Sequence, residues 1–198
     1  MDELSEGGKL SDVLVNVCLR QFRERMHAPE RCVVVDALWL WAAKVDVDAL
    51  ARVSAHLLSV DFIYVPMCAH SHWAGAVVCR APGGSYRILV LDSLRRGQSP
   101  FNARPACEVL VGAIQATWRA HRLGDCPRVD WVPVMGVPEQ PNAVDCALYM
   151  VALFAEHNAS LPALHLQDSP RWEGGTVRHA RIQEMRDQLR HALLACKC

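Results

Sequence analysis

The chain has 198 residues, of which 52% are hydrophobic, so it is long and apolar enough to form one domain, residues 1–198, with a buried core. This composition excludes an intrinsically disordered chain. Its 21 basic and 21 acidic residues cancel to a formal charge of zero, so the charge balance indicates neither a nucleic acid nor an anionic membrane surface as a partner.

The cellular setting is predicted from the N-terminus, the apolar runs and the cysteines. The opening Met1-Asp2-Glu3-Leu4 lacks the pattern of a secretory signal peptide, and no apolar run is long enough to span a bilayer. The nine cysteines lie mostly in apolar segments, where a free thiol behaves as a small hydrophobe. We therefore expect a reduced, intracellular protein of the nucleus, the cytoplasm or both.

The first part of the chain is predicted to contain two helices and a short strand. Apolar residues at helical spacing indicate a helix over about residues 10–25, with an apolar face formed by Leu10, Val13, Leu14, Val17 and Cys18. Residues 33–35 are expected to form a short strand. Asp36 is then expected to cap a helix that carries residues 37–41.

Three strands are predicted in the middle of the chain, at residues 62–66, 74–79 and 86–91. The last two are joined by the turn residues 81–85 and form a hairpin. His72 stands at the start of one hairpin strand and Asp92 at the end of the other. Because the start of one antiparallel strand lies beside the end of its partner, we expect these two side chains to meet.

The remaining elements complete an α+β pattern. A helix is predicted over about residues 104–121, a strand over 129–135, a buried helix after Cys146 and an amphipathic helix over 177–194. No internal repeat or domain linker interrupts this order. Helices, then strands, then helices are typical of an α+β domain.

The segment that ends at Cys146 has the pattern of a nucleophilic thiol at a helix start. Asp145 is a good N-cap residue, and the positive end of the following helix favours the thiolate form of a cysteine. Gln140 lies six residues upstream and carries a side-chain amide that is able to donate to an oxyanion. The backbone N–H of Cys146, at the helix start, is a second expected donor.

These residues supply the four parts that acyl transfer by cysteine requires. Cys146 is the predicted nucleophile, His72 the base, Asp92 the group that orients the base, and Gln140 the oxyanion donor. Each residue type at such a position is more often structural when it is considered alone. It is their joint order and flanking pattern that favour a cysteine hydrolase.

The same motifs resemble the SUMO/sentrin-specific proteases, which are ubiquitin-like-protein-specific cysteine proteases. The matching segments are residues 10–16, residues 61–66, the pair His72-Trp73, the run Leu91-Asp92-Ser93-Leu94 and the run Gln140-Pro141-Asn142-Ala143-Val144-Asp145-Cys146. The resemblance implies a papain-like α+β fold with a central mixed or antiparallel sheet flanked by helices. It also implies a catalytic triad of His72, Asp92 and Cys146, with Gln140 in the oxyanion hole.

The resemblance further implies a substrate. Relatives cleave after the Gly-Gly end of a ubiquitin-like modifier, whose tail threads a tunnel too narrow for a Cβ atom. Trp73 matches a tunnel tryptophan, and Asp12 matches an acidic residue that pairs with an arginine of the modifier. Lys9 stands where many members have a second tryptophan, and Ala147 replaces the usual glycine after the nucleophile.

A monomer without cofactor or metal is expected, acting on a SUMO-type modifier and its conjugates. The choice among SUMO, a NEDD8-like modifier and ubiquitin stays open, as does the choice between precursor maturation and removal from lysine. Two alternatives are a same-clan acetyltransferase that uses acetyl-CoA and a binding module that has lost catalysis. A metal site formed by Cys68, His70 and His72 is a weaker alternative, because no second ligand cluster accompanies it.

Overall fold

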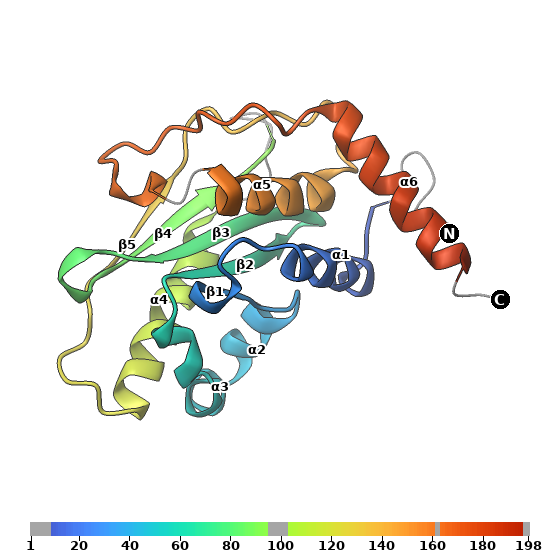
Figure 1. The fold of residues 1–198 in the computed structure, drawn as a ribbon. Helices are drawn as coiled ribbons and strands as arrows, with labels where there is room; N and C mark the ends of the chain where they lie inside the picture. The colour runs from blue at the N-terminus through green and yellow to red at the C-terminus, as the bar shows by residue number, and fades with distance from the viewer. Residues whose placement is uncertain (1–8, 95–102, 161–162, 196–198) are drawn as a thin grey trace.

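The computed structural model of the protein describes residues 9–94, 103–160 and 163–195. A five-stranded sheet forms the centre of the fold, and helices cover both of its faces (Figure 1). The strands follow one another across the sheet in chain order: β1 (Cys32–Val34), β2 (Phe62–Ala69), β3 (His72–Arg80), β4 (Tyr86–Leu91) and β5 (Val129–Pro133). The inner pairs β2–β3 and β3–β4 are antiparallel, whereas the outer pairs β1–β2 and β4–β5 are parallel. The predicted α+β class with a mixed sheet is therefore confirmed.

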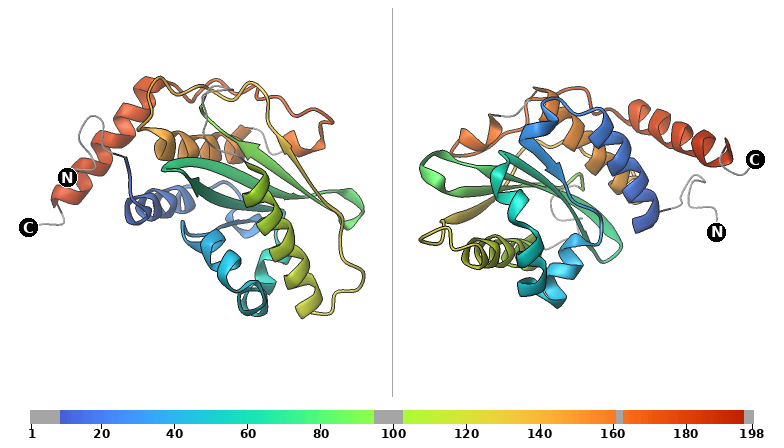
Figure 2. Two further views of the ribbon diagram at one scale, coloured as in Figure 1. Left: turned by 180° about the vertical axis from the view of Figure 1, so that it is seen from behind. Right: turned by 60° about the horizontal axis from the view of Figure 1, so that its bottom comes forward.

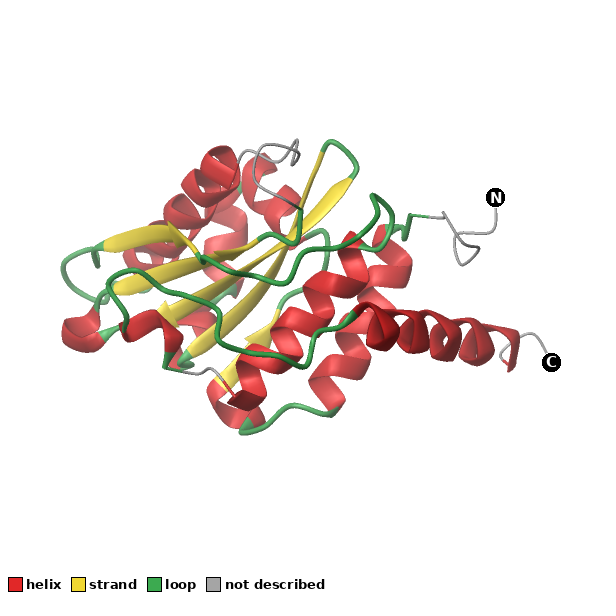
Figure 3. Ribbon diagram, turned by 90° about the horizontal axis from the view of Figure 1, so that it is seen from above, coloured by secondary structure: helices red, strands yellow, loops and turns green. Residues whose placement is uncertain are grey.

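Six α-helices lie in the described part of the chain: α1 (Asp12–Glu24), α2 (Trp39–Val45), α3 (Val47–Val53), α4 (Ala103–Ala120), α5 (Cys146–Ser160) and α6 (His179–Ala195). Helices α1 and α5 cover one face of the sheet, and α2, α3 and α4 lie on the other (Figures 1 and 2). Seen from above, α6 extends away from the sheet toward the C-terminus (Figure 3). None of the helices in the described ranges combines the length and apolar composition needed to cross a membrane.

Each face of the sheet carries its own apolar core. One core joins the sheet to α1, α5 and α6, and the other joins it to α4 and the 3₁₀ turn Ala55–Ser59. The central strands are buried on both faces, which explains why β3 is apolar almost without interruption from Trp73 to Cys79. Helix α5 is buried from Cys146 through Phe154, as its apolar sequence predicts.

Helix α5 lies very close to the sheet at Gly75 of β3. A Cβ atom built on Gly75 would stand 2.5 Å from Cε1 of Phe154 and 3.2 Å from Cγ of Met150. Glycine therefore allows a close approach that a larger residue would block. This approach fixes the height of α5, and with it the position of Cys146, above the sheet.

The N-terminal helices differ from the sequence prediction in three respects. The helix expected over residues 37–41 begins at Trp39, because the Asp36 carboxylate accepts from the backbone N–H of Leu38 and forms a turn instead of a cap. Helix α3 was not predicted at all. Its N-cap is Asp46, whose side chain accepts from the backbone N–H of Ala49.

The buried face of α1 also differs from the predicted one. Val13 was assigned to the apolar stripe, yet its relative exposure is 66%. The buried residues of the helix are Val15, Cys18, Leu19 and Phe22. Of the predicted apolar face, Leu10 and Cys18 are buried, and Leu14 and Val17 pack against the core, so the prediction was wrong at Val13.

Candidate active site

Cys146 is the first residue of α5, and it is almost completely buried, with a relative exposure of 1%. The backbone N–H of Trp73 donates to its sulfur over 3.4 Å. The helix start and the first residues of β3 thus meet at this sulfur. The sulfur therefore lies at the N-terminus of α5 and accepts a main-chain hydrogen bond from β3.

His72 and Asp92 meet as the hairpin pattern predicts. His72 is the first residue of β3, Asp92 directly follows β4, and the pairing of Gly75 with Leu91 brings the two strand ends together. The Nε2 atom of His72 lies 2.8 Å from Oδ1 of Asp92. The His72 side chain is 4% exposed and that of Asp92 is 22% exposed, so the pair lies at the edge of the solvent.

The surroundings of His72 favour the charged imidazole. Burial by itself lowers the pKa of His72, but hydrogen bonds to Asp92 and Cys146 outweigh burial and raise the pKa to about 9. Because Nε2 faces Asp92, Nδ1 is the nitrogen that serves Cys146. At neutral pH the ring is therefore an imidazolium beside the sulfur.

Gln140 lies in the loop before α5 and is 8% exposed. Its Oε1 accepts from the hydroxyl of Ser93 over 2.6 Å, and its Nε2 donates to the carbonyl oxygen of Asn142. The backbone N–H of Gln140 donates to the carbonyl oxygen of Ser93 over 2.8 Å. These contacts hold the side-chain amide in one orientation and identify which of its ends is the Nε2 donor.

Gln140 and His72 line one hollow of about 330 Å³, together with Asn142 and Ala143. A reacting carbonyl group in this hollow would have the imidazole on one side and the Gln140 amide on another. The structure therefore brings together all four residues that the sequence singled out for catalysis.

A larger hollow of about 860 Å³ lies beside Trp73. The Trp73 ring is buried at 6% exposure, and its indole N–H donates to the carbonyl oxygen of Leu10 over 3.2 Å. Lys9 lines both hollows, and Asp12 lines the larger one. The three residues expected to contact the substrate thus lie around one surface next to the catalytic residues.

Sequence reasoning missed residues on both sides of this site. Trp41 and Leu38 line the larger hollow and are 65% and 50% exposed, and the sequence predicted only that their segment is helical. Ser93 and Asn142 hold Gln140, and nothing in the sequence alone identified their hydroxyl and carbonyl groups as its partners.

The metal alternative was wrong. Within the described ranges, no group of three or more His, Cys, Asp or Glu residues is placed to hold a metal ion. The reason is a turn at His70 and Ser71, both of which have positive φ. The turn pairs Cys68 with Trp73, and Ala69 with His72. Successive pairs alternate between the faces of a sheet, so the side chains of Cys68 and His72 lie on opposite faces.

Residues 41–195 match the model of the Ulp1 protease family, C-terminal catalytic domain. Lys9 and Asp12 lie outside this range, so their assignments rest on the motif resemblance and on the hollow that they line. No curated protein sequence matches the chain.

Several solved structures share the fold at low sequence identity. The SUMO protease Ulp1 with its catalytic cysteine oxidised to a sulfenic acid has a TM-score of 0.68 and 15% identity, over 98% of this chain and 81% of that one. The C-terminal Ulp1 protease domain in complex with Smt3, the yeast ortholog of SUMO, has a TM-score of 0.66 and 16% identity, over 97% and 79%. The Xanthomonas campestris effector XopD bound to ubiquitin has a TM-score of 0.59 and 14% identity, over 91% and 90%. At these identities the likeness concerns the fold.

Proposed function

The chain belongs to the Ulp1 protease family and is a cysteine peptidase, and from this premise we propose that it cleaves after the C-terminal Gly-Gly of a ubiquitin-like modifier, with SUMO preferred. The observation that carries the proposal is the contact of His72 with both Asp92 and Cys146, on the same hollow as Gln140. The family match also favours peptidase chemistry over the acetyltransferase alternative.

In the proposed reaction the thiolate of Cys146 attacks the carbonyl carbon of the last glycine. The carbonyl oxygen becomes an oxyanion, which accepts from the Gln140 amide and from the backbone N–H of Cys146. His72, already protonated, gives its proton to the nitrogen of the leaving amine, and the C–N bond breaks. Asp92 keeps the ring oriented and stabilises its positive charge.

The acyl-enzyme is then hydrolysed. Neutral His72 takes a proton from a water molecule, and the resulting hydroxide attacks the thioester carbon. A second oxyanion forms in the same hollow and collapses, which releases the modifier as a carboxylic acid and regenerates the Cys146 thiolate beside the imidazolium; the acid then loses its proton to solvent. No residue outside the four is needed to balance the protons.

The two hollows supply a path for the modifier. They share Lys9, His70 and Ser71, so the surface is continuous from the exposed Trp41 to the catalytic residues. In this proposal the body of the modifier covers the larger hollow, and its tail passes Trp73 toward Cys146. A diglycine tail suits such a path because it presents no Cβ atoms to the walls.

The departure at Ala147 is compatible with the proposed activity. Ala147 is the second residue of α5 and is 1% exposed, so its methyl group is accommodated inside the core. Alanine is also the better helix former of the two residue types.

The proposal is tested with SUMO, NEDD8 and ubiquitin, each carrying a C-terminal propargylamide that reacts with a cysteine nucleophile. We expect the SUMO probe to form the fastest adduct, mapped by mass spectrometry to Cys146, and no adduct with Cys146→Ser. Faster reaction of NEDD8 or ubiquitin would contradict the SUMO preference. Absence of reaction with all three would contradict modifier cleavage and favour the binding-module alternative.

A separate experiment tests whether the enzyme favours precursor maturation or removal of the modifier from lysine. A SUMO precursor with a C-terminal extension and a SUMO–lysine isopeptide conjugate are compared for kcat/KM. The faster substrate distinguishes maturation of precursors from removal of the modifier.

A further inference from the structure

A chain of hydrogen bonds runs from Ser93, just after β4, to the loop that precedes α5. Ser93 donates to Gln140 over 2.6 Å, and Gln140 donates to the carbonyl oxygen of Asn142. The Nδ2 atom of Asn142 then donates to Oδ2 of Asp145 over 2.7 Å, while its Oδ1 accepts the backbone N–H groups of Val144 and Asp145. The oxyanion donor and the residue before the nucleophile are therefore parts of one bonded loop.

This chain ends on α6. The Nη2 and Nε atoms of Arg186 donate to Oδ1 of Asp145 over 2.6 and 3.1 Å, and Gln183 donates to Oδ2 over 3.2 Å. The side chains of Arg186 and Asp145 are only 3% and 1% exposed. Breaking a buried pair by removing one partner leaves an uncompensated charge and is strongly unfavourable. Each side chain therefore holds the other firmly in place.

The position of Arg186 on α6 is unusual for a cation. Ile182, Arg186 and Leu189 are buried at relative exposures of 0%, 2% and 1%, and their i, i+4, i+7 spacing makes them one stripe. An arginine thus occupies the centre of the face that an amphipathic helix reserves for apolar residues. Asp145 supplies a buried opposite charge for it.

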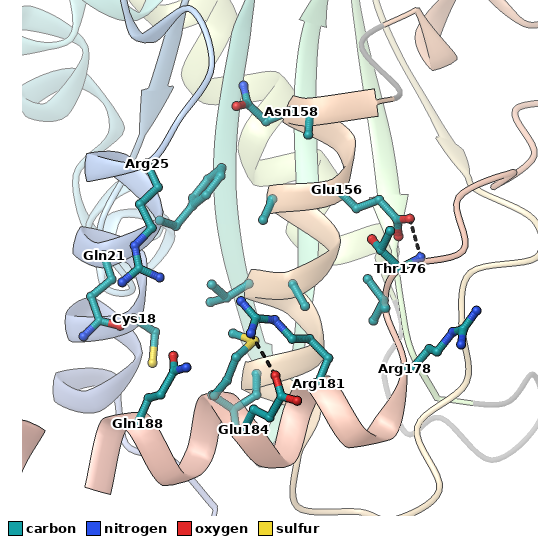
Figure 4. A pocket seen from close by; sticks show the side chains of 18 of the residues that line it. Cys18, Gln21, Arg25, Glu156, Asn158, Thr176, Arg178, Arg181, Glu184 and Gln188 are labelled. Atoms are coloured by element: carbon teal, nitrogen blue, oxygen red, sulfur yellow. Dashed lines mark hydrogen bonds and ion pairs between the residues drawn. The ribbon is translucent and has the colours of Figure 1, made fainter. Parts of the chain in front are cut away.

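A groove of about 630 Å³ borders α6. It lies between α1, α5 and α6 and is lined by Glu184 and Gln188 of α6, by Gln21 of α1 and by Arg25, the C-cap residue of α1 (Figure 4). In Figure 4, α6 crosses the end of α5 beside this groove. The buried stripe with Arg186 at its centre attaches α6 to the protein beside the active site.

We propose that α6 is a positioning element of the catalytic site and that Arg186 acts through Asp145 to hold the loop from Gln140 to Cys146. The proposal rests on the proposed function for its kinetic consequences. Without Arg186 the loop relaxes, the Gln140 amide loses its alignment with the oxyanion, and the transition state loses more stabilisation than the bound substrate does. The expected signature is a lower kcat with little change in KM.

The test compares Arg186→Met, Asp145→Asn and the double variant, with Arg190→Met as a control on the same helix. Arg190 is more exposed and pairs with Asp187 at the surface, so its change should affect neither Tm nor kcat. Each single variant leaves one buried charge without the opposite charge that it faces in the wild type, and should lower Tm. The double variant removes both charges and should recover most of the lost Tm.

The kinetics of the double variant decide between positioning and mere stabilisation. We expect its kcat on a SUMO–coumarin reporter to stay about tenfold or more below wild type, with KM within about threefold. Recovery of Tm together with full kcat would show that the pair only stabilises the fold, and would overturn the proposal.

Two further measurements keep the outcome clear. The rate at which iodoacetamide alkylates Cys146 at pH 7 requires no modifier, and it should fall about fivefold or more in the double variant because the start of α5 shifts. If no modifier is cleaved by the wild type, the proposed function fails, while an unchanged alkylation rate would independently overturn the positioning role. If the Arg186 variants do not fold, Gln183→Ala is the deciding variant, because it removes a weaker hydrogen bond to Asp145. We expect kcat to fall about two- to fivefold, as for the loss of one weak hydrogen bond, while Tm stays unchanged.

Discussion

The backbone N–H of Trp73 points at the sulfur of Cys146 across 3.4 Å. A main-chain donor is present whatever side chain stands at position 73, so the polarity around the sulfur does not depend on the tryptophan ring. The ring itself is engaged elsewhere, with its indole N–H on the carbonyl oxygen of Leu10. One residue thus supports the nucleophile through its backbone and the proposed substrate path through its side chain.

The pH profile should report the His72–Asp92 pair. The pKa of His72 is raised to about 9, so the imidazolium persists below this pH and is lost above it. We expect kcat/KM on a SUMO–coumarin reporter to decline as the pH rises through about 9. Asp92→Asn removes the carboxylate that raises the pKa and should move this decline to lower pH, with a lower maximum. An alkaline limb that does not move would contradict the assigned role of Asp92.

The oxyanion assignment predicts graded losses at two residues. Gln140→Ala should reduce kcat about 10²-fold with little change in KM, because it removes a donor that acts in the transition state. Ser93→Ala leaves that donor present but unoriented, so we expect a loss of about tenfold. Ser169→Ala, an exposed serine far along the chain, is the control. A rise in KM alone for Gln140→Ala would remove Gln140 from the oxyanion hole.

The two residues of the proposed tail path should be unequal. Trp73→Ala should severely reduce cleavage of a SUMO–coumarin substrate, because the ring is buried and fastens the Leu10 segment. Lys9→Ala should have a small effect, since only its alkyl stem covers the surface. Lys9→Trp should preserve or improve cleavage. A large loss from Lys9→Ala with an inactive Lys9→Trp would mean that Lys9 binds a specific group of the substrate.

Acid should destabilise the fold through His157. This residue is fully buried, and its Nδ1 lies 3.1 Å from the hydroxyl of Tyr64, whereas its Nε2 has no hydrogen-bond partner among the described residues. Burial, and to a lesser degree His165, lower the pKa of His157 from 6.5 to about 3. Below pH 6.5 the unfolded chain therefore binds a proton that the folded protein does not, and stability falls with pH.

Between pH 7 and pH 5 this effect should lower the free energy of unfolding by about 2 kcal/mol. Urea unfolding at both pH values, compared between wild type and His157→Gln, isolates it from other titrating groups. The exposed His191→Gln serves as the control. Equal acid sensitivity of wild type and His157→Gln would refute the assignment.

The close approach of α5 to β3 predicts that Gly75→Ala is harmful. The added Cβ would collide with the Phe154 ring, and we expect a loss of about 1–3 kcal/mol in unfolding free energy. Phe154→Leu in the same chain should recover part of the loss by making room. Gly112→Ala in α4 is the matched control, because its Cβ meets nothing within 4 Å and alanine favours the helix. A neutral Gly75→Ala would mean that α5 moves without cost.

The sequence predicted the catalytic residues better than the residues that hold them in position. His72 and Asp92 were accessible because antiparallel pairing brings strand ends together, and Cys146 because a capped apolar helix has a recognisable start. Arg186 was not accessible, since its partner is 41 positions away and an arginine on a helix normally faces solvent. The exposure of Trp41 was not accessible either. An apolar run at residues 37–41 predicts a helix, but only the arrangement of α2 beside the larger hollow shows that Trp41 is exposed.

The long separation between Asp145 and Arg186 bears on how the enzyme is made. During synthesis the nucleophile leaves the ribosome several seconds before the helix that fastens its loop, at typical rates of about 5–20 residues per second. In that interval the thiol exists, but the proposed positioning of its loop does not. A nascent chain should therefore be unable to strip modifiers from its neighbours, and competence should arise abruptly when the last helix docks. Arrested chains that end before and after α6 would show this step directly when treated with the SUMO propargylamide probe.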